Sequence, residues 1–582
     1  MAKNDKYLLD QVLSAKATEV APDLPADRFF ELFVADELLK HYGLSNDELD
    51  SGLVAGGNDG GIDGIYGFVN DNLLSPDYDY PTVKNNPIIH LVIIQAKQST
   101  SFSETAINNL IASANDLLDL EATLPDLSKR YNGQLMAVIA DYHNAVKELA
   151  NKFPTFRFSY FYVTKGDSSS VHQNVQGRVK TLEGKLIDYF NEIDFNFKFL
   201  GARDLLALAR KQTSSALKLN LTEYLPAGNG GVIGLVKLKD YFDFITDSDG
   251  RRLQNIFDAN VREYVGDVDV NKGIRATLEK GDPKINFWWL NNGITIVASK
   301  APVTGKTLML ENPKVVNGLQ TSQEIFEYFS SRSIHNEDFR ELLVRVIVTA
   351  DEEIRNLVIK ATNSQTKISP EILRATEQIH HDIEQDFYHH GLFYDRQKNY
   401  YKNLGKPRNK IVTVKYLAQT ITAMVLQEPN NSRGRPTNLI NDETSYQRIF
   451  SSSYDISLYR KCALLMKTID DFLRRDAPDS AKRESTNLRW QLAMFIAAWL
   501  SNDIKVEPNK LANNLSSNGA DSELLTHSVR HVYDVFSTIK SRTSLDGDRI
   551  AKNKEFDSDV LSRLKDIQDG LRKFDVKEDA VA

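Results

Sequence analysis

The chain has 582 residues, and its 71 lysines and arginines against 79 aspartates and glutamates give a net charge of −8. This length allows about three or four domains, each able to bury its own core. The acidic balance excludes a uniformly basic coat for nucleic acid, although local basic patches are compatible with it. Cys462 is the single cysteine, which excludes an intrachain disulfide and a cysteine-based zinc site.

Two features of the sequence bear on its location. The first residues, MAKNDK, show no apolar signal-peptide segment, and the longest apolar stretch, residues 490–500, is too short to span a bilayer. We therefore expect a cytoplasmic protein with no membrane partner. Residues 490–500 are interpreted as a buried helix of a C-terminal helical domain.

The first informative element is a helix predicted over residues 28–42, with Asp27 as its N-cap and Gly43 as its stop. Glu31 lies one turn from Val34, on or beside the apolar stripe of this helix. An acid turned toward the core suggests a function. The alternative is an ordinary half-exposed glutamate on a helix.

A glycine-rich loop and a strand follow the helix. The glycines of residues 56–64 let the backbone turn tightly and let a ligand approach Asp63. The strand predicted over residues 90–95 is apolar on both faces, so it should be central and buried. By strand periodicity Gln95 and Lys97 share one face. Polar groups in such a place are costly without partners, and a divalent cation and a phosphate would be suitable partners.

These pieces resemble the Mrr-type branch of the PD-(D/E)xK nucleases over roughly residues 25–105. The matching segments, in order, are Phe30-Glu31, Gly60-Gly61-Ile62-Asp63-Gly64 and Ile94-Gln95-Ala96-Lys97. The resemblance implies a site for Mg²⁺ or Mn²⁺ formed by Asp63, Gln95 and the Ala96 carbonyl. It also implies that Lys97 positions or activates water and that Glu31 is an auxiliary acid. Gln95 replaces the usual acid, as in the Mrr branch. The alternative is a nuclease-like fold kept as a DNA-binding platform.

The rest of the chain is predicted to be a mixed α/β, multidomain protein. Residues 70–87 are interpreted as an inserted surface loop. Beyond them we predict helices over 103–120 and 202–210 and strands over 135–140, 157–164 and 197–200, an alternation typical of an α/β layer. The predicted domains are a nuclease-like α/β domain (1–220), a central α/β domain (221–427) and a mostly helical C-terminal domain (428–582).

The central domain contains four blocks that resemble the AIPR family, which is named for abortive-infection phage resistance. They are NIFDANVREYVG (255–266), NFWWLNNGITIV (286–297), PKVVNGLQTSQEIF (313–326) and IKATNSQTKISPEILRA (359–375). The resemblance spans roughly residues 230–425. It implies a prokaryotic anti-phage setting and does not supply a reaction.

Two of these blocks also suggest an anion site. A strand over 314–316, a tight turn at Asn317-Gly318 and a helix over 321–329 would point free N–H groups at a phosphate. The blocks are similar to the nucleotide-binding boxes of ParB-type CTPases, although Thr321 and Thr366 stand where arginines would be. This similarity implies a nucleoside triphosphate bound by Asn317, Gly318, Gln320, Thr321, Asn363 and Gln365. The alternatives are a shared scaffold with buried amides and, for residues 291–293, a simple β-hairpin turn.

Basic and aromatic residues alternate in residues 393–415, which makes this segment the best candidate for contacts with a nucleic-acid backbone. The residues concerned are Arg396, Lys398, Tyr400, Tyr401, Lys402, Lys406, Arg408 and Lys410. A solvated loop is the alternative interpretation.

We therefore predict an anti-phage defence protein that acts as a Mg²⁺-dependent DNA endonuclease under the control of its AIPR domain. Its expected partners are phage or host DNA, further copies of the chain in a homo-oligomer, and a protein encoded in the same operon. Two other functions remain open: a non-catalytic DNA-binding sensor or scaffold, and an AIPR switch that binds or hydrolyses a nucleotide.

Overall fold

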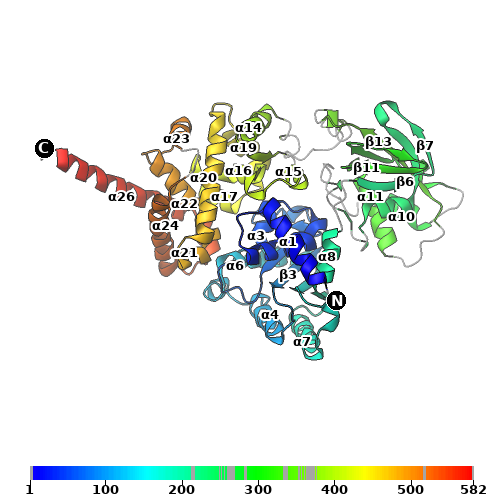
Figure 1. The fold of residues 1–582 in the computed structure, drawn as a ribbon, viewed down its shortest axis with the longest axis horizontal. Helices are drawn as coiled ribbons and strands as arrows, with labels where there is room; N and C mark the ends of the chain where they lie inside the picture. The colour runs from blue at the N-terminus through cyan, green and yellow to red at the C-terminus, as the bar shows by residue number, and fades with distance from the viewer. Residues whose placement is uncertain are drawn as a thin grey trace. The chain divides into compact units, whose positions relative to one another are not determined.

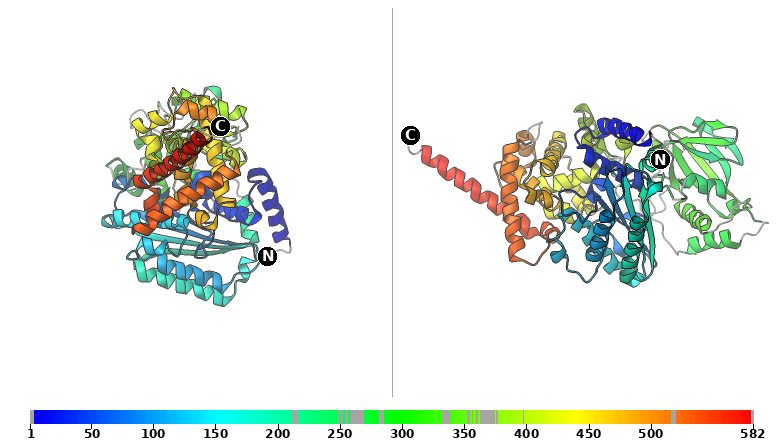
Figure 2. Two further views of the ribbon diagram at one scale, coloured as in Figure 1. Left: turned by 90° about the vertical axis from the view of Figure 1, so that its left-hand side faces the viewer. Right: turned by 60° about the horizontal axis from the view of Figure 1, so that its bottom comes forward.

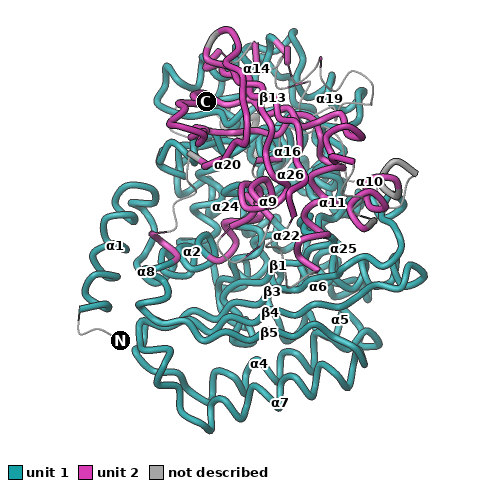
Figure 3. Tube along the Cα trace, turned by 90° about the vertical axis from the view of Figure 1, so that its right-hand side faces the viewer, with its two compact units in different colours: residues 1–37, 44–207, 378–582 teal, residues 38–43, 208–377 magenta. Residues whose placement is uncertain are grey.

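The computed structural model describes residues 4–210, 216–247, 250, 252–253, 256–257, 269–280, 285–331, 338–351, 354–355, 357–358, 361, 374, 377–396, 398–515 and 520–579. The chain divides into two compact units (Figures 1 and 3). Unit 1 comprises Met1–Glu37, Leu44–Ala207 and Gln378–Ala582, and unit 2 comprises Leu38–Gly43 and Leu208–Glu377. The predicted fold class is confirmed, since helices and several sheets are mixed and the C-terminal region is helical. In the described parts of the chain, no helix is long and apolar enough to cross a membrane.

The N-terminal part of unit 1 is built on a five-stranded sheet of order β2-β1-β3-β4-β5. Its strands are β1 (Gly64–Val69), β2 (Asn72–Leu73), β3 (Ile88–Lys97), β4 (Thr155–Thr164) and β5 (Ile193–Leu200). β1 runs antiparallel to β3, whereas β3, β4 and β5 are mutually parallel. The predicted central strand is therefore confirmed as β3, which is buried along most of its length.

Helices cover both faces of this sheet. They are α1 (Asp5–Val20), α2 (Ala26–Leu39), α3 (Asn46–Gly52), α4 (Glu104–Leu117), α5 (Leu124–Leu127), α6 (Gly133–Leu149), α7 (Gln173–Phe190) and α8 (Ala202–Arg210). On one face α4, α6 and α7 bury an apolar core against the sheet, and Figures 2 and 3 show α4 and α7 side by side. On the other face α3 approaches β1, where the Tyr66 hydroxyl donates to the Leu49 carbonyl at 2.8 Å.

The strand predicted over residues 135–140 is wrong, because these residues lie within α6. Asn132 caps this helix by accepting the Leu135 N–H, and the apolar residues continue at helical spacing through Ile139, Tyr142 and Val146. A short apolar run does not by itself distinguish a strand from a buried helix. The start of α2 also differs from the prediction: Asp27 lies in its first turn rather than capping it.

Where the structure describes it, the C-terminal part of unit 1 is helical apart from a two-stranded sheet, β14 (Phe393–Asp395) with β15 (Ile411–Thr413). Its helices are α14 (Gln378–His389), α15 (Tyr400–Asn403), α16 (Val414–Met424), α17 (Pro429–Gly434), α18 (Asn438–Asn441), α19 (Glu443–Ile449), α20 (Ile456–Arg475), α21 (Asp479–Arg483), α22 (Ser485–Leu500), α23 (Pro508–Asn514), α24 (Ser522–Arg542), α25 (Gly547–Ala551) and α26 (Lys554–Asp579). The buried helix predicted over 490–500 is confirmed as the second half of α22, at the centre of one large core.

The described residues of unit 2 form two sheets, of order β12-β9-β13-β8-β7 and β10-β11-β6. Its strands are β6 (Ala216–Asn220), β7 (Glu223–Pro226), β8 (Val232–Lys237), β9 (Ile294–Ala298), β10 (Val303–Thr304), β11 (Thr307–Glu311), β12 (Lys314–Asn317) and β13 (Glu341–Val348). The helices α9 (Leu238–Ile245), α10 (Asp269–Lys280) and α11 (Leu319–Ser330) contribute to a single apolar core with these sheets.

Candidate active site

The glycine-rich loop before β1 is held in place by polar groups of α4 and α6. The Asn132 side chain donates to the carbonyls of Ala55 (3.2 Å) and Gly57 (3.1 Å). The Ser113 hydroxyl of α4 donates to the Gly60 carbonyl at 2.6 Å. Because the loop is fixed at several points, the carboxylate that follows it is presented in a defined position.

Asp63 lies at the end of this loop, beside the end of β3. Its Oδ2 accepts the Ala96 N–H at 2.8 Å and lies 3.6 Å from the Lys97 Nζ. Burial raises the pKa of Asp63, while the positive charge of Lys97 and the Ala96 N–H oppose this rise. Since only 7 % of Asp63 is exposed, the carboxylate is poised to gain from a further cation.

Glu31 reaches the same place from α2. The Nη1 of Arg28 contacts Glu31 Oε2 at 2.5 Å and also donates to the Val54 carbonyl at 2.9 Å, so this arginine ties α2 to the start of the loop. Burial raises the pKa of Glu31 to about 7; Arg28 opposes the rise and the nearby Asp63 adds to it. The Glu31 side chain is 15 % exposed, so it lies mostly inside as predicted, and α2 brings it within electrostatic range of Asp63 and Lys97.

Gln95 supplies an unpartnered acceptor. It is 2 % exposed, and its Oε1 has no hydrogen-bond partner within the described residues. Gly61, at φ +81°, passes close to it: a Cβ at this position would lie 3.3 Å from the Gln95 Nε2 and 2.9 Å from the Asn109 Cβ. An orphaned amide oxygen in a buried place needs an explanation, and a cation is one.

The donor atoms fit a small hard cation. The carboxylate of Asp63, the amide oxygen of Gln95 and a backbone carbonyl at Ala96 are the oxygen ligands that Mg²⁺ and Mn²⁺ prefer. Across the described ranges no group of three or more His, Cys, Asp or Glu residues is arranged to hold a metal. The candidate site therefore carries little negative charge for a metal centre.

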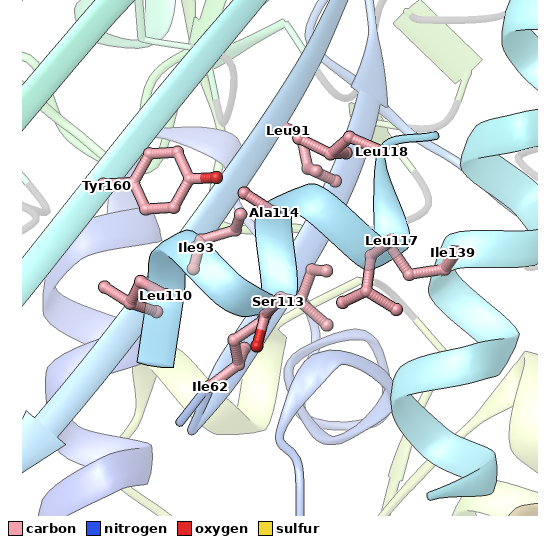
Figure 4. Close-up of a pocket in the computed structure, with 11 residues that line it drawn as sticks. Ile62, Leu91, Ile93, Leu110, Ser113, Ala114, Leu117, Leu118, Ile139 and Tyr160 are labelled. Atoms are coloured by element: carbon pink, nitrogen blue, oxygen red, sulfur yellow. The ribbon is translucent and has the colours of Figure 1, made fainter. Parts of the chain in front are cut away.

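A small cavity lies between β3 and α4, behind this site (Figure 4). Its walls are almost entirely apolar, and Ser113 and Tyr160 contribute the polar side chains. Such a lining belongs to the core of the domain and offers nothing to a phosphate.

The sequence did not lead us to expect that Arg28 and Asn132 help to position the site. Arg28 could have been found from its i,i+3 spacing to Glu31, which places both residues on one helix face. Asn132 gave no comparable signal, because the carbonyls that it holds lie more than seventy residues earlier in the chain.

The predicted basic strip is largely occupied by partners within unit 1. Arg396 pairs with Glu384, Lys398 with Glu48, Lys402 with Asp36 and Arg408 with Asp50, while Lys406 lies over the ring of Phe393 and Tyr401 donates to Glu384. Tyr400 is 48 % exposed and Lys410 is also exposed. Binding of nucleic acid by this strip stays a prediction, and it applies best to the exposed members.

In unit 2 two of the polar blocks meet. The Asn291 Oδ1 accepts the Gly293 N–H and the Thr321 hydroxyl, both at 3.2 Å. Gly318 caps α11 at φ 102°, a backbone conformation that suits glycine. Residues 291–293 do not form the β-hairpin turn considered above, because a 3₁₀ turn, Phe287–Leu290, precedes them instead of a strand. Asn317 precedes Gly318 and Gln320 lies in the first turn of α11, whereas Asn363 and Gln365 lie outside the described residues.

The comparison with protein families matches residues 257–577 to the family described as AIPR protein, which is more than half of the chain. The chain belongs to the AIPR family. Membership supports a role in abortive infection, that is, in defence against phage. No curated protein and no solved structure matches the chain.

The AIPR match extends further than the blocks suggested. It includes residues of both units, since positions 257–377 belong to unit 2 and positions 378–577 to unit 1. Within unit 1 the AIPR residues Lys398, Lys402 and Arg408 pair with acids on α2 and α3 that precede the match. The candidate site and the later part of the family segment, positions 378–577, are therefore parts of one packed unit.

Proposed function

We propose that this AIPR protein is a metal-dependent DNA endonuclease of an anti-phage system and that its active site is the cluster of Glu31, Asp63, Gln95 and Lys97. The observation that carries the proposal is the unpartnered Oε1 of buried Gln95, next to a buried Asp63 that already faces Lys97. In an ordinary protein core, buried amide and carboxylate groups are either hydrogen-bonded or absent.

Asp63, Gln95 and the Ala96 carbonyl would hold Mg²⁺ or Mn²⁺, which when bound supplies Lewis-acid stabilisation of the charge on the scissile phosphate. Lys97 is exposed at the end of β3, so its ammonium can contact a phosphate oxygen and orient the attacking water. Glu31, with a pKa raised to about 7, can exchange a proton with that water near neutral pH. Attack forms a new bond between water and phosphorus and releases the leaving sugar oxygen.

The AIPR segment would control this site. In unit 1 its residues Lys398 and Lys402 form ion pairs with acids on α3 and α2, and α2 carries Glu31. DNA of phage or host, a second copy of the chain and an operon-encoded protein are the partners that we propose.

Purified wild type, Asp63→Asn and Lys97→Ala can be compared on plasmid and phage DNA with Mg²⁺ or Mn²⁺, with and without nucleoside triphosphates. Lys84→Ala is a matched control, because Lys84 is an exposed lysine of the inserted loop. Cleavage by wild type and the control alone would support the proposal. Cleavage that survives in both site variants would reject it. A non-catalytic DNA-binding scaffold predicts instead that Lys97→Ala leaves phage protection intact.

A nucleotide switch in unit 2 is a second candidate. It is favoured by the glycine-capped N-terminus of α11, where Thr321 and Asn291 are joined. The nucleotide would also involve Asn317, Gln320, Asn363 and Gln365. This candidate predicts nucleotide turnover or binding that is unchanged in Asp63→Asn and lost in Gly318→Val.

A further inference from the structure

A second lysine stands at the edge of the sheet that carries Lys97. β3 and β4 are parallel neighbours, and their register sets Lys97 opposite Thr164. Lys165 follows Thr164 directly, and its N–H donates to the Ser99 carbonyl at 2.9 Å. In open α/β sheets the carboxyl ends of parallel strands are where ligands bind. Lys97 and Lys165 therefore occupy adjacent places at the binding edge.

The side chain of Lys165 extends toward α2. Its Nζ lies 5.4 Å from the centroid of the Phe30 ring, and Phe30 precedes Glu31. The ammonium contacts Asp10 Oδ1 at 2.8 Å and Gln98 Oε1 at 3.2 Å. An ammonium has three N–H groups, so these two acceptors leave one donor for a ligand. A compact point charge of this kind is a common phosphate contact in proteins.

The counter-ion of Lys165 comes from a helix most of whose residues are exposed or half-exposed. Asp10 belongs to α1, which lies along the outside of unit 1 in Figure 2. Among the contacts that attach α1 are two buried leucines, Leu9 and Leu13, and Lys16, which pairs with Glu37 at 2.8 Å and lies over the ring of Phe33. The Asp10 side chain is 39 % exposed, whereas that of Lys165 is 12 % exposed. An ion pair with one partner so accessible contributes little and exchanges readily.

We propose that Lys165 is a second cation for the phosphodiester backbone at this edge, and that Asp10 holds its ammonium until a phosphate takes its place. The inference rests on the proposed function, because it names a further contact of the same site with its nucleic-acid substrate. In this proposal α1 covers Lys165, and its Asp10 is displaced from the ammonium by the phosphate. Removing the Asp10 charge frees the lysine, and removing the lysine charge loses one phosphate contact.

The test measures binding of a short fluorescent DNA duplex by the full chain, with Ca²⁺ in place of Mg²⁺ to hold back cleavage. Lys165→Gln should weaken binding at every salt concentration and lower the slope of log affinity against log salt by about one. Lys165→Arg should retain most of the affinity, and Asp10→Asn should bind several-fold more tightly than wild type. Lys6→Gln is the matched control, because it removes one positive charge from an exposed position of α1, leaves the Lys16–Glu37 pair intact and is expected to leave the slope unchanged.

Two results would overturn the inference. One is a Lys165→Gln protein, shown by its thermal unfolding to be folded, that binds with the affinity and slope of the Lys6→Gln control. The other is an Asp10→Asn protein whose binding is no tighter than that of wild type. A separate cleavage assay with Mg²⁺ or Mn²⁺ tests the proposed function. If binding depends on Lys165 but wild type does not cleave, the nuclease proposal fails and the inference stands.

Discussion

Lys402 of α15 forms a 2.9 Å ion pair with Asp36 of α2 across 366 residues of sequence, and the same Nζ donates to the Leu44 carbonyl at 2.8 Å. Lys398 and Arg408 make similar pairs with Glu48 and Asp50 of α3. A strip that looks in the sequence like a phosphate-binding surface therefore binds acids of its own chain. The ion pairs between these segments explain both the acids of α2 and α3 and the basic residues at 398–408.

Reversing the charge at Lys402 should destabilise unit 1. Lys402→Glu places like charges together and removes the donor to Leu44, so we expect the free energy of unfolding to fall by about 1 kcal/mol or more. Adding Asp36→Lys should recover part of the loss. Urea unfolding of the two single variants and the double variant measures this coupling.

Lys410→Glu is the control for that cycle, because Lys410 lies in the same strip and is exposed. It makes the same change of charge and should alter stability little. The ion pair does not hold the two segments together if Lys402→Glu is as stable as the control. The same follows if the double variant loses the sum of the stabilities lost by the two single variants.

Local patterns in the sequence predicted the elements that position the site. The apolar run before Gln95 predicted β3, and the spacing of Glu31 from Val34 predicted the inward face of α2. The α-helix itself ends earlier than predicted, at Leu39, and Gly43 caps the 3₁₀ turn Lys40–Tyr42 that follows it. The helix predicted over 202–210 agrees in both bounds with α8. These predictions succeeded because periodicity and capping are properties of neighbouring residues.

Partners distant in sequence could not be predicted in the same way. Nothing near Lys402 indicates that its counter-ion is Asp36, and nothing near Lys165 indicates Asp10. The apolar run of 135–140 was assigned to a strand because so short a run fits a buried strand and a buried helix equally well, and only the fold shows it packed against the sheet as part of α6. Long-range contacts are decided by the tertiary fold, which a single sequence does not display.

The raised pKa of Glu31 should be visible in the pH dependence of stability. Burial raises the pKa of Glu31 from 4.5 to about 7, so the folded state binds this proton more tightly than the unfolded state. The stabilisation is fully present below about pH 4.5 and is lost as pH rises through about 7. Glu31→Gln, which cannot titrate, should gain stability relative to wild type over this window. Urea unfolding at a series of pH values measures the difference, and a pH-independent difference would contradict the assignment.

Gly61 should be intolerant of a side chain for a reason specific to the site. In Gly61→Ala the new Cβ would approach the Asn109 Cβ to 2.9 Å and the Gln95 Nε2 to 3.3 Å. Gly56→Ala is the matched control, since Gly56 has φ +88° and nothing within 4 Å of its added Cβ. Both variants incur the backbone cost of a left-handed alanine, and Gly61→Ala should lose about 1–3 kcal/mol more. Thermal unfolding compares them, and equal losses would show that the crowding at Gly61 is unimportant.

The metal site can be tested through stability without any nuclease assay. A ligand that binds only the folded state raises the melting temperature, so Mg²⁺ or Mn²⁺ should stabilise wild type after treatment with a chelator. Asp63→Asn should abolish that gain, because it removes the one carboxylate among the three proposed ligands.

Gln95→Glu should increase the stabilisation by metal, the opposite of the effect expected for Asp63→Asn. It restores a second carboxylate at a position that is 2 % exposed, next to the buried Asp63. Without metal the added acid should lower the melting temperature, because a second buried carboxylate beside Asp63 is left poorly compensated. With Mg²⁺ or Mn²⁺ the extra negative charge should strengthen binding, so that the metal-induced rise exceeds that of wild type. Thermal unfolding across a metal titration gives both effects. Identical rises in wild type, Asp63→Asn and Gln95→Glu would mean that the cation binds elsewhere on the chain.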